Sequence, residues 1–187
     1  MKIGYMGIPF SNSEEAAEIF VRKNRWNDAA FIPLMSAPSV VKELEKRSVD
    51  YGVVATRNAV AGPVIETADS LNGKSNIEEY QTADVPIHHC LFVKREGCSV
   101  AAVASHVQAL MQTAGNIGRM FPLAERIEVE DTAYAAEMLA DGLLPDSTAV
   151  VCRKDAGEHY GLHLLKENIE DDPTNMTSFS LLRIISE

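Results

Sequence analysis

The stretch DYGVVATRN at residues 50–58 limits most strongly what this chain can fold into. Its apolar residues follow one another without polar alternation, which is typical of a strand buried on both faces in a parallel sheet. The chain before and after it fits this interpretation. We predict strands at 2–6 and 31–35 and helices that begin after Ser11, after Ser39 and at 64. This β-α-β-α-β-α order predicts an open α/β sheet with helices on its faces.

Several helix starts carry capping signals. Ser11 with Glu14, and Ser105 with Gln108, have the spacing of a capping box, in which a hydroxyl and an acid or amide satisfy free backbone N–H groups. We therefore expect Ser11 and Ser105 to be N-caps, and Ser39 and Asp131 to cap two further helices.

The character of the sequence changes after residue 76. Residues 77–93 are typical of extended chain that crosses to another region, and Pro86 favours an edge or a bend. Further strands are expected at 100–104, 127–129, 148–152, 162–165 and 179–185. We predict two lobes, about 1–76 plus 177–187 and about 77–176. They are joined by two crossing strands, with a cleft between the lobes.

Composition excludes several classes of protein. The 187 residues suit one large domain or two small lobes, and the net charge of −10 argues against a nucleic-acid-binding surface. Three cysteines without a CxxC spacing predict reduced thiols in a cytoplasmic protein. The apolar run at the N-terminus is too short for a signal peptide, so we expect none there. The longest uncharged stretch contains His106, Gln108, Gln112 and Asn116, so we expect no membrane partner. Adjacent His88 and His89 would face opposite sides of a strand, which predicts no metal site there.

Polar side chains follow two of the predicted strands directly. Ser11 and Ser13 come after the first strand, and Arg57 and Asn58 end the third. Ligands of open α/β sheets bind at the carboxyl ends of the strands, and a helix N-terminus suits a carboxylate or phosphate. Plain capping is the alternative. The segment NMTSF at 175–179 is likewise open to two interpretations, turn chemistry or the working end of an active site.

A series of motifs resembles one known family. In order, they are KIGYMG with SNSEEAA, DYGVVATRNAVAGPVIETADSL, PIHHCLFV, VASHVQALMQ, EDTAYAA, HYGLHLL and NMTSF. Together they resemble the catalytic domain of prephenate dehydratase over essentially the whole chain, 1–187. The resemblance implies a two-lobed fold similar to type 2 periplasmic binding proteins. It also implies a lyase that converts prephenate to phenylpyruvate with loss of water and carbon dioxide, in phenylalanine biosynthesis.

The resemblance carries further expectations. No metal or organic cofactor is expected, and relatives are commonly homodimers or larger homo-oligomers. Family members commonly carry a regulatory ACT domain that binds phenylalanine. This sequence stops at Glu187, so we expect that module, and the feedback inhibition it provides, to be missing.

The family motifs imply a set of site residues. Thr177 corresponds to the threonine thought to help protonate the leaving hydroxyl. Hydroxyls, amides and helix N-termini are expected to hold the two substrate carboxylates. The predicted substrate-binding residues are Ser11, Ser13, Arg57, Asn58, Gly62, Ser105, His106, Thr132, Ser178 and Phe179.

Two motifs depart from the family pattern. The terminal motif is usually Asn-x-Thr-Arg-Phe, and Ser178 stands where the arginine is usual. In TRN at 56–58, Arg57 replaces a usual glutamate, and Ala55 replaces a usual proline. We hypothesise that Arg57 restores a positive charge; the alternatives are that it points to solvent or pairs with Glu66.

The departures leave the activity open. One alternative is a prephenate decarboxylase that does not aromatise its product. Another is an inactive protein that binds a small acid or amino acid. The preference between prephenate and its aminated analogue arogenate is also open.

Overall fold

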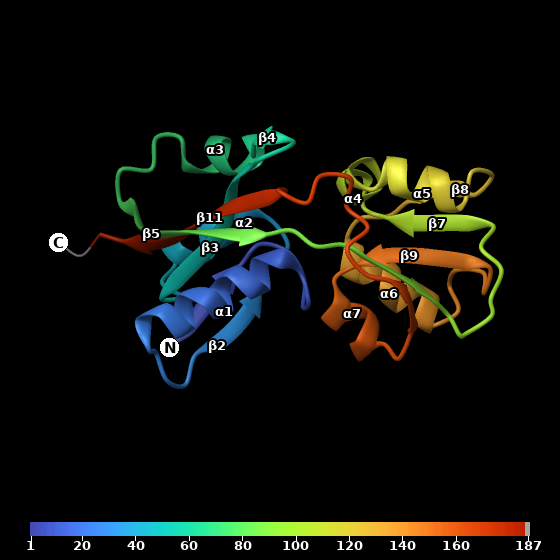
Figure 1. Cartoon of the computed structure of the whole chain (residues 1–187). Helices are drawn as coiled ribbons and strands as arrows, with labels where there is room; N and C mark the ends of the chain where they lie inside the picture. Colours follow the sequence, from blue (N-terminus) through green and yellow to red (C-terminus); the bar gives the residue numbers. More distant parts are fainter. Residues whose placement is uncertain (186–187) are drawn as a thin grey trace. The chain divides into compact units, whose positions relative to one another are not determined.

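The structure is a computed structural model that describes residues 1–185. The chain forms two compact units, shown in Figure 1: unit 1 comprises residues 1–87 and the segment from Met176, and unit 2 comprises residues 88–175. The first boundary was predicted near residue 76 and lies instead at 87. The reason is that β5 (Ile77–Pro86) does not leave the first unit but pairs along its whole length with β11 (Met176–Ile184).

The sheet of unit 1 has six strands, in the order β2-β1-β3-β11-β5, with β4 attached to β3. Strands β1 (Lys2–Tyr5), β2 (Ala30–Pro33) and β3 (Tyr51–Asn58) are parallel, as the apolar run at 50–58 predicts. Strand β11 is antiparallel to both of its neighbours and lies between β3 and β5 (Figure 1). The start of β11 therefore lies beside the carboxyl end of β3.

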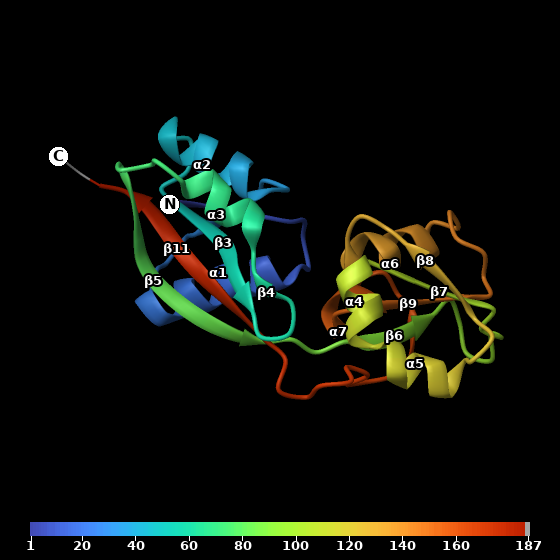
Figure 2. The ribbon, with the colours of Figure 1, turned by 90° about the horizontal axis from the view of Figure 1, so that it is seen from above.

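Helices cover both faces of this sheet, as predicted (Figure 2). Helix α1 (Asn12–Asn24) packs on one face, where Phe20 meets Tyr5 and Phe179 in a buried cluster. Helices α2 (Ala37–Glu45) and α3 (Ile65–Leu71) cover the other face. Burial of these apolar stripes against the sheet, rather than helix propensity, holds the unit together.

The caps of unit 1 confirm one prediction and correct another. Ser11 is the N-cap of α1 and accepts a hydrogen bond from the Glu14 amide at 3.4 Å. Ser39 was predicted to cap α2, but the cap is Ser36, whose Oγ accepts from the Ser39 amide at 3.3 Å. The helix begins earlier because Pro38 fits its first turn, where no backbone donor is needed.

Unit 2 contains a five-stranded sheet in the order β10-β6-β9-β7-β8. Strands β7 (Ala102–Ser105), β8 (Glu125–Glu128) and β9 (Thr148–Cys152) are parallel. Strand β6 (Cys90–Val93) runs antiparallel to β9, and β10 (His163–Lys166) runs antiparallel to β6. The parallel part gives this unit, like unit 1, an edge at which several strand ends and helix starts meet.

Three helices of unit 2 begin at that edge, α4 (Val107–Gln112), α6 (Thr132–Ala140) and α7 (Lys154–His159), and α5 (Ala114–Met120) follows α4 directly. Helices α4 and α5 pack on one face of the sheet, and α6 and α7 follow β8 and β9. Asp131 caps α6 as predicted and accepts from the Ala133 amide at 2.7 Å. Ser105 was predicted to cap α4, but it belongs to β7, and His106 is the cap: its Nδ1 accepts from the Gln108 amide at 3.2 Å.

Candidate functional site

The start of β11 places Thr177 against Asn58, the last residue of β3. The two residues are register partners, and the Asn58 Nδ2 group donates a hydrogen bond to Thr177 Oγ1 at 2.9 Å. The Asn58 Oδ1 atom accepts from the amides of Val60 at 3.0 Å and Ala61 at 2.8 Å. The loop thus fixes the orientation of the Asn58 amide, with its NH₂ group toward the threonine.

This arrangement determines how the Thr177 hydroxyl takes part in hydrogen bonding. Its oxygen accepts from Asn58, and within residues 1–185 the hydroxyl itself donates to no acceptor. Both side chains are largely buried, so water is partly excluded from the pair. A hydroxyl whose oxygen accepts one hydrogen bond still has its own O–H group as a donor.

Ser178 lies on the other face of β11, because successive side chains of a strand alternate. Its register partners are Arg57 on β3 and Asp84 on β5. The Ser178 hydroxyl donates to Asp84 Oδ1 at 2.6 Å. Asp84 was not predicted as part of the site. It comes before the crossing of the chain, and only the register of β5 on β11 brings it there.

Arg57 stands directly opposite Ser178, so the two departures from the family pattern are neighbours across one strand pair. The Arg57 side chain is exposed, and among the described residues it forms no hydrogen bond or ion pair. Glu66 accepts instead from the Ala37 amide, at 3.5 Å. Of the alternatives weighed for Arg57, the ion pair with Glu66 is therefore absent from residues 1–185.

The remaining predicted residues of unit 1 have different environments. Ser11 and Ser13 lie largely buried at the turn between β1 and α1. That turn needs Gly7, which has φ = 100°, and a Cβ there would come within 2.9 Å of Ser11 Oγ. Gly62 belongs to β4 and pairs with Asn58. Phe179, at 2% exposure, packs in the hydrophobic core under α1.

In unit 2 the predicted residues Ser105, His106 and Thr132 gather at the carboxyl edge of the parallel strands. Ser105 is fully buried, and its hydroxyl donates to the Val151 carbonyl at 2.6 Å. Thr132 is the first residue of α6, directly after Asp131. Burial raises the pKa of Asp131, although the amides of Ala133 and Tyr134 and nearby His106 oppose that shift.

Arg153 is a further cation at this edge, and sequence analysis did not identify it. It follows the last residue of β9 and is the N-cap of α7. Its side chain is only 16% exposed, and it forms a fork with Asp155, with Nε and Nη2 at 3.0 and 2.8 Å from the two carboxylate oxygens. The only signal in the sequence is its position immediately after a buried apolar run.

The paired histidines serve the structure of unit 2. His88 Nδ1 lies 2.8 Å from Glu170 Oε1, and His89 Nε2 lies 2.9 Å from Gln112 Oε1. Burial lowers the pKa of His89. Burial alone would raise the pKa of Glu170, but hydrogen bonds from His88 and from the His89 amide lower it overall. Within the described part of the chain, no cluster of three or more His, Cys, Asp or Glu residues could hold a metal ion.

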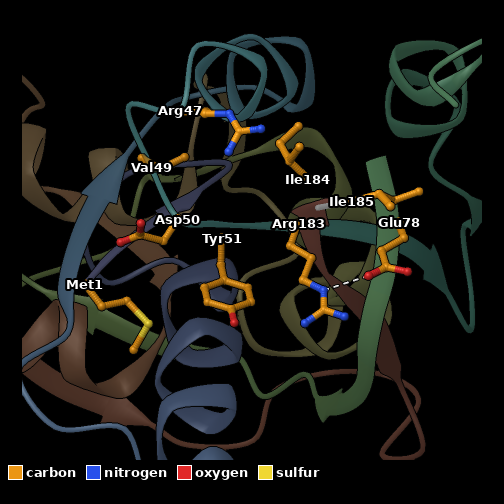
Figure 3. A pocket seen from close by; sticks show the side chains of 9 residues that line it. All are labelled: Met1, Arg47, Val49, Asp50, Tyr51, Glu78, Arg183, Ile184 and Ile185. Atoms are coloured by element: carbon orange, nitrogen blue, oxygen red, sulfur yellow. Dashed lines mark hydrogen bonds and ion pairs between the residues drawn. The ribbon is translucent and has the colours of Figure 1, made fainter. Parts of the chain in front are cut away.

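A hollow of about 750 Å³ lies at the other end of the unit 1 sheet (Figure 3). Tyr51, which begins β3, and Arg183, near the end of β11, line it. Arg183 Nε donates to Glu78 at 2.7 Å, and Trp26 stacks on Tyr51 with ring centroids 4.5 Å apart. Asn58 and Thr177 occupy the opposite ends of the same two strands. The hollow is therefore not part of the candidate site.

The two α/β units, joined by two chain crossings, form a fold similar to that of periplasmic binding proteins. A periplasmic substrate-binding protein of an ABC transporter from Coxiella burnetii shares this fold, with a TM-score of 0.52 and 11% identity over 98% of this chain and 84% of that one. The chain itself belongs to the prephenate dehydratase family, whose model matches residues 3–185. The predicted α/β fold and family resemblance are thus confirmed.

Relatives of this family are similar along most of the chain. An arogenate dehydratase from Arabidopsis thaliana is 31% identical over 185 residues, and a bifunctional chorismate mutase/prephenate dehydratase from Neisseria gonorrhoeae is 36% identical over 154. These alignments cover 97% and 79% of this chain but 42% of each relative, so the chain spans less than half of their length.

A solved structure of prephenate dehydratase from Arthrobacter aurescens, in complex with L-Phe, superposes with a TM-score of 0.86. It is 24% identical, and the match covers 100% of this chain and 61% of that one, which supports the fold. No helix within residues 1–185 has the length and apolar character needed to cross a membrane.

Proposed function

We propose that this chain is a lyase that converts prephenate to phenylpyruvate, with loss of water and carbon dioxide, in phenylalanine biosynthesis. One observation carries the proposal beyond family membership: the Asn58 amide holds the Thr177 hydroxyl as an acceptor and leaves its proton available. Because one relative is named an arogenate dehydratase, the aminated analogue arogenate is the second substrate to test.

The reaction sets a simple demand on the protein. The ring hydroxyl of prephenate leaves as water and takes up one proton, while the ring carboxylate leaves as carbon dioxide. The electrons of the broken C–C bond complete the aromatic ring, so no oxidant is required. The protein must hold two carboxylates and place one proton donor at the departing hydroxyl. We assign that donor role to Thr177.

Threonine is a weak acid, so this role depends on its surroundings. As the proton moves to the leaving hydroxyl, negative charge develops on Thr177 Oγ1, where the Asn58 N–H already points at 2.9 Å. A donor placed in advance at developing charge stabilises the transition state without reorganisation. Hydrogen bonds to charged groups are worth roughly 1.5–3 kcal/mol, which corresponds to about one to two decades in rate.

We further propose that Arg57 attracts a substrate carboxylate. Its exposed side chain leaves the end of β3 on the face of Ser178, whose hydroxyl is bound to Asp84, so Arg57 would reach a substrate at Thr177 around the end of the strand. An Arg57→Glu variant should bind prephenate and phenylpyruvate more weakly, by about one to two decades, because a favourable charge becomes a repulsive one. Equal affinity of variant and wild type would end this assignment.

The activity assay follows phenylpyruvate at alkaline pH after incubation with prephenate or arogenate. Thr177→Val keeps the shape of the side chain but removes the hydroxyl, and it should abolish dehydration, whereas Thr177→Ser should retain part of it. Ser180→Ala is the matched control, since Ser180 is a buried hydroxyl on the same strand that binds Glu79 instead. Undiminished dehydration by Thr177→Val would remove Thr177 from its assigned role.

The same assay separates the alternative functions. A non-aromatic decarboxylated product identifies a prephenate decarboxylase, and tight binding without turnover identifies a binding protein. The contributions predicted for Ser105, His106 and Thr132 are tested by single alanine variants. We also propose that the protein is cytoplasmic and forms a homodimer or a larger homo-oligomer. Light scattering of the purified protein tests the oligomeric state.

A further inference from the structure

Two of the three cysteines face each other across a strand pair in unit 2. Cys90, the first residue of β6, and Cys152, the last residue of β9, are direct register partners in an antiparallel ladder. Figure 2 shows these two strands side by side. Partners in such a ladder point to the same face of the sheet. Cys98, the third cysteine, lies outside the strands and is partly exposed.

The geometry of this pair fits a disulfide. Directly opposite residues of an antiparallel ladder have Cα atoms about 4.5–5.5 Å apart. Disulfides span about 4.4–6.8 Å between Cα atoms, so the backbone is already in range. The Cβ atoms of opposite residues lie about 4.5–5.5 Å apart against about 3.8 Å in a disulfide, so a closure of about 1 Å completes the bond.

The surroundings control access to the two thiols. Cys90 is 3% exposed and Cys152 is not exposed at all. Burial raises the pKa of both thiols, and each also feels nearby acidic groups. A hydrogen bond from the Gly157 amide of the short helix α7 opposes this rise of the Cys152 pKa. An oxidant therefore reaches the pair only when the structure opens locally, and the reaction is faster at higher pH.

We propose that Cys90 and Cys152 form an oxidation site that closes to an intramolecular disulfide between β6 and β9. With a small organic disulfide as oxidant, the Cys90 thiolate attacks one sulfur and releases one thiol. The Cys152 thiolate then attacks the Cys90 sulfur and releases the second thiol. Two protein S–H bonds and the S–S bond of the oxidant break, one protein S–S bond forms, and the two protons end on the released thiols.

The disulfide would be a covalent cross-link at the start of unit 2. Cys90 directly follows His89, whose backbone amide is held by Glu170 at 3.0 Å. The link would fasten this first stretch of unit 2 to the end of β9, which otherwise depends on non-covalent pairing alone. Because the closed loop is long, the link removes much conformational freedom from the unfolded chain.

The test treats the purified protein with bis(2-hydroxyethyl) disulfide at pH 8.5, in urea below the unfolding transition, and then alkylates the remaining thiols. We expect a Cys90–Cys152 peptide by mass spectrometry and a thermal midpoint raised by roughly 5 °C or more. Cys98→Ser, the matched control, should still form the link, while Cys90→Ala and Cys152→Ala should not.

Two results would overturn the proposal. In the first, the oxidant has modified Cys98 completely, but Cys90 and Cys152 both still react with the alkylating agent once the protein is fully unfolded. The other is that the intramolecular link joins Cys98 to either of them. If the disulfide forms but the thermal midpoint stays unchanged or falls, the proposed stabilisation by the cross-link is refuted.

Discussion

The hydrogen bonds of Asn58 predict that replacing this residue lowers both the stability of the protein and its catalytic rate, for separate reasons. In Asn58→Ala, the amides of Val60 and Ala61 lose an acceptor but are exposed enough to return to water. The Met176 carbonyl and Thr177 Oγ1 lose a donor at 3.3 and 2.9 Å. At about 0.5–1.5 kcal/mol for each of these two hydrogen bonds, the free energy of unfolding should fall by roughly 1–3 kcal/mol. The Met176 carbonyl still accepts from the Ala59 amide at 2.8 Å, which favours the lower end of this range.

Catalysis should suffer independently of that loss. Without the Asn58 donor, charge on Thr177 Oγ1 is unsupported, so kcat for dehydration should fall by about 10- to 100-fold. KM should change less, because this interaction strengthens in the transition state. Asn58→Asp keeps the acceptor for the loop amides but offers the Thr177 hydroxyl a carboxylate. It should preserve more stability and lose at least as much activity.

The measurements are urea unfolding followed by circular dichroism, and steady-state formation of phenylpyruvate. Asn24→Ala is the matched control, because Asn24 binds Phe20 and Gln81 in the same unit at 2.8 and 2.9 Å, away from Thr177. It should lose comparable stability and keep its turnover. A folded Asn58→Ala protein that turns over prephenate at the wild-type rate would refute the reasoning.

Other positions allow sharper tests of packing and protonation. Gly157→Ala would place a Cβ 2.4 Å from the Phe92 ring and should lower the free energy of unfolding in urea by roughly 1–3 kcal/mol. In Gly118→Ala the new Cβ meets no atom within 4 Å, so this control should be neutral or stabilising. Thr148→Val should stabilise the protein by about 1 kcal/mol, because the buried Thr148 hydroxyl has no hydrogen-bond partner within residues 1–185; a loss of stability would contradict this. Burial lowers the pKa of His89 below 6.5, so the unfolded chain binds a proton at a higher pH than the folded chain does. The free energy of unfolding should therefore fall as the pH drops below about 6.5, and this fall should be smaller in His89→Gln.

Local signals in the sequence predicted the elements that local chemistry determines. Ser11 and Asp131 have a short polar side chain directly before an amphipathic run, and both are caps in the structure. The apolar run at 50–58 predicted a central parallel strand because burial on both faces removes polar alternation. The cap of α2 was predicted at Ser39 and lies at Ser36, because the helix begins three residues earlier than the apolar spacing indicated.

Features that depend on strand register were not predictable in this way. Residues 77–86 mix polar and apolar positions, so the sequence did not predict their pairing with β11, and the boundary of the first unit was predicted too early in the chain. The bond between Ser178 and Asp84 and the position of Arg57 opposite Ser178 arise from the same register. The position of Asn58 at a strand end already made it a candidate, and the family resemblance added the role of Thr177. Their contact at 2.9 Å comes from the structure.

The position of β11 between β3 and β5 has a consequence for biosynthesis. Residues 1–87 emerge from the ribosome with a gap in the middle of their sheet, and no later residue fills it until 176–184 have been made. Residues 88–175 contain all five strands of their own sheet and can therefore fold during translation while the earlier segment waits. The pairing of β11 with β3 and β5, and with it the Asn58–Thr177 contact, can therefore form only after residues 88–175 have been made.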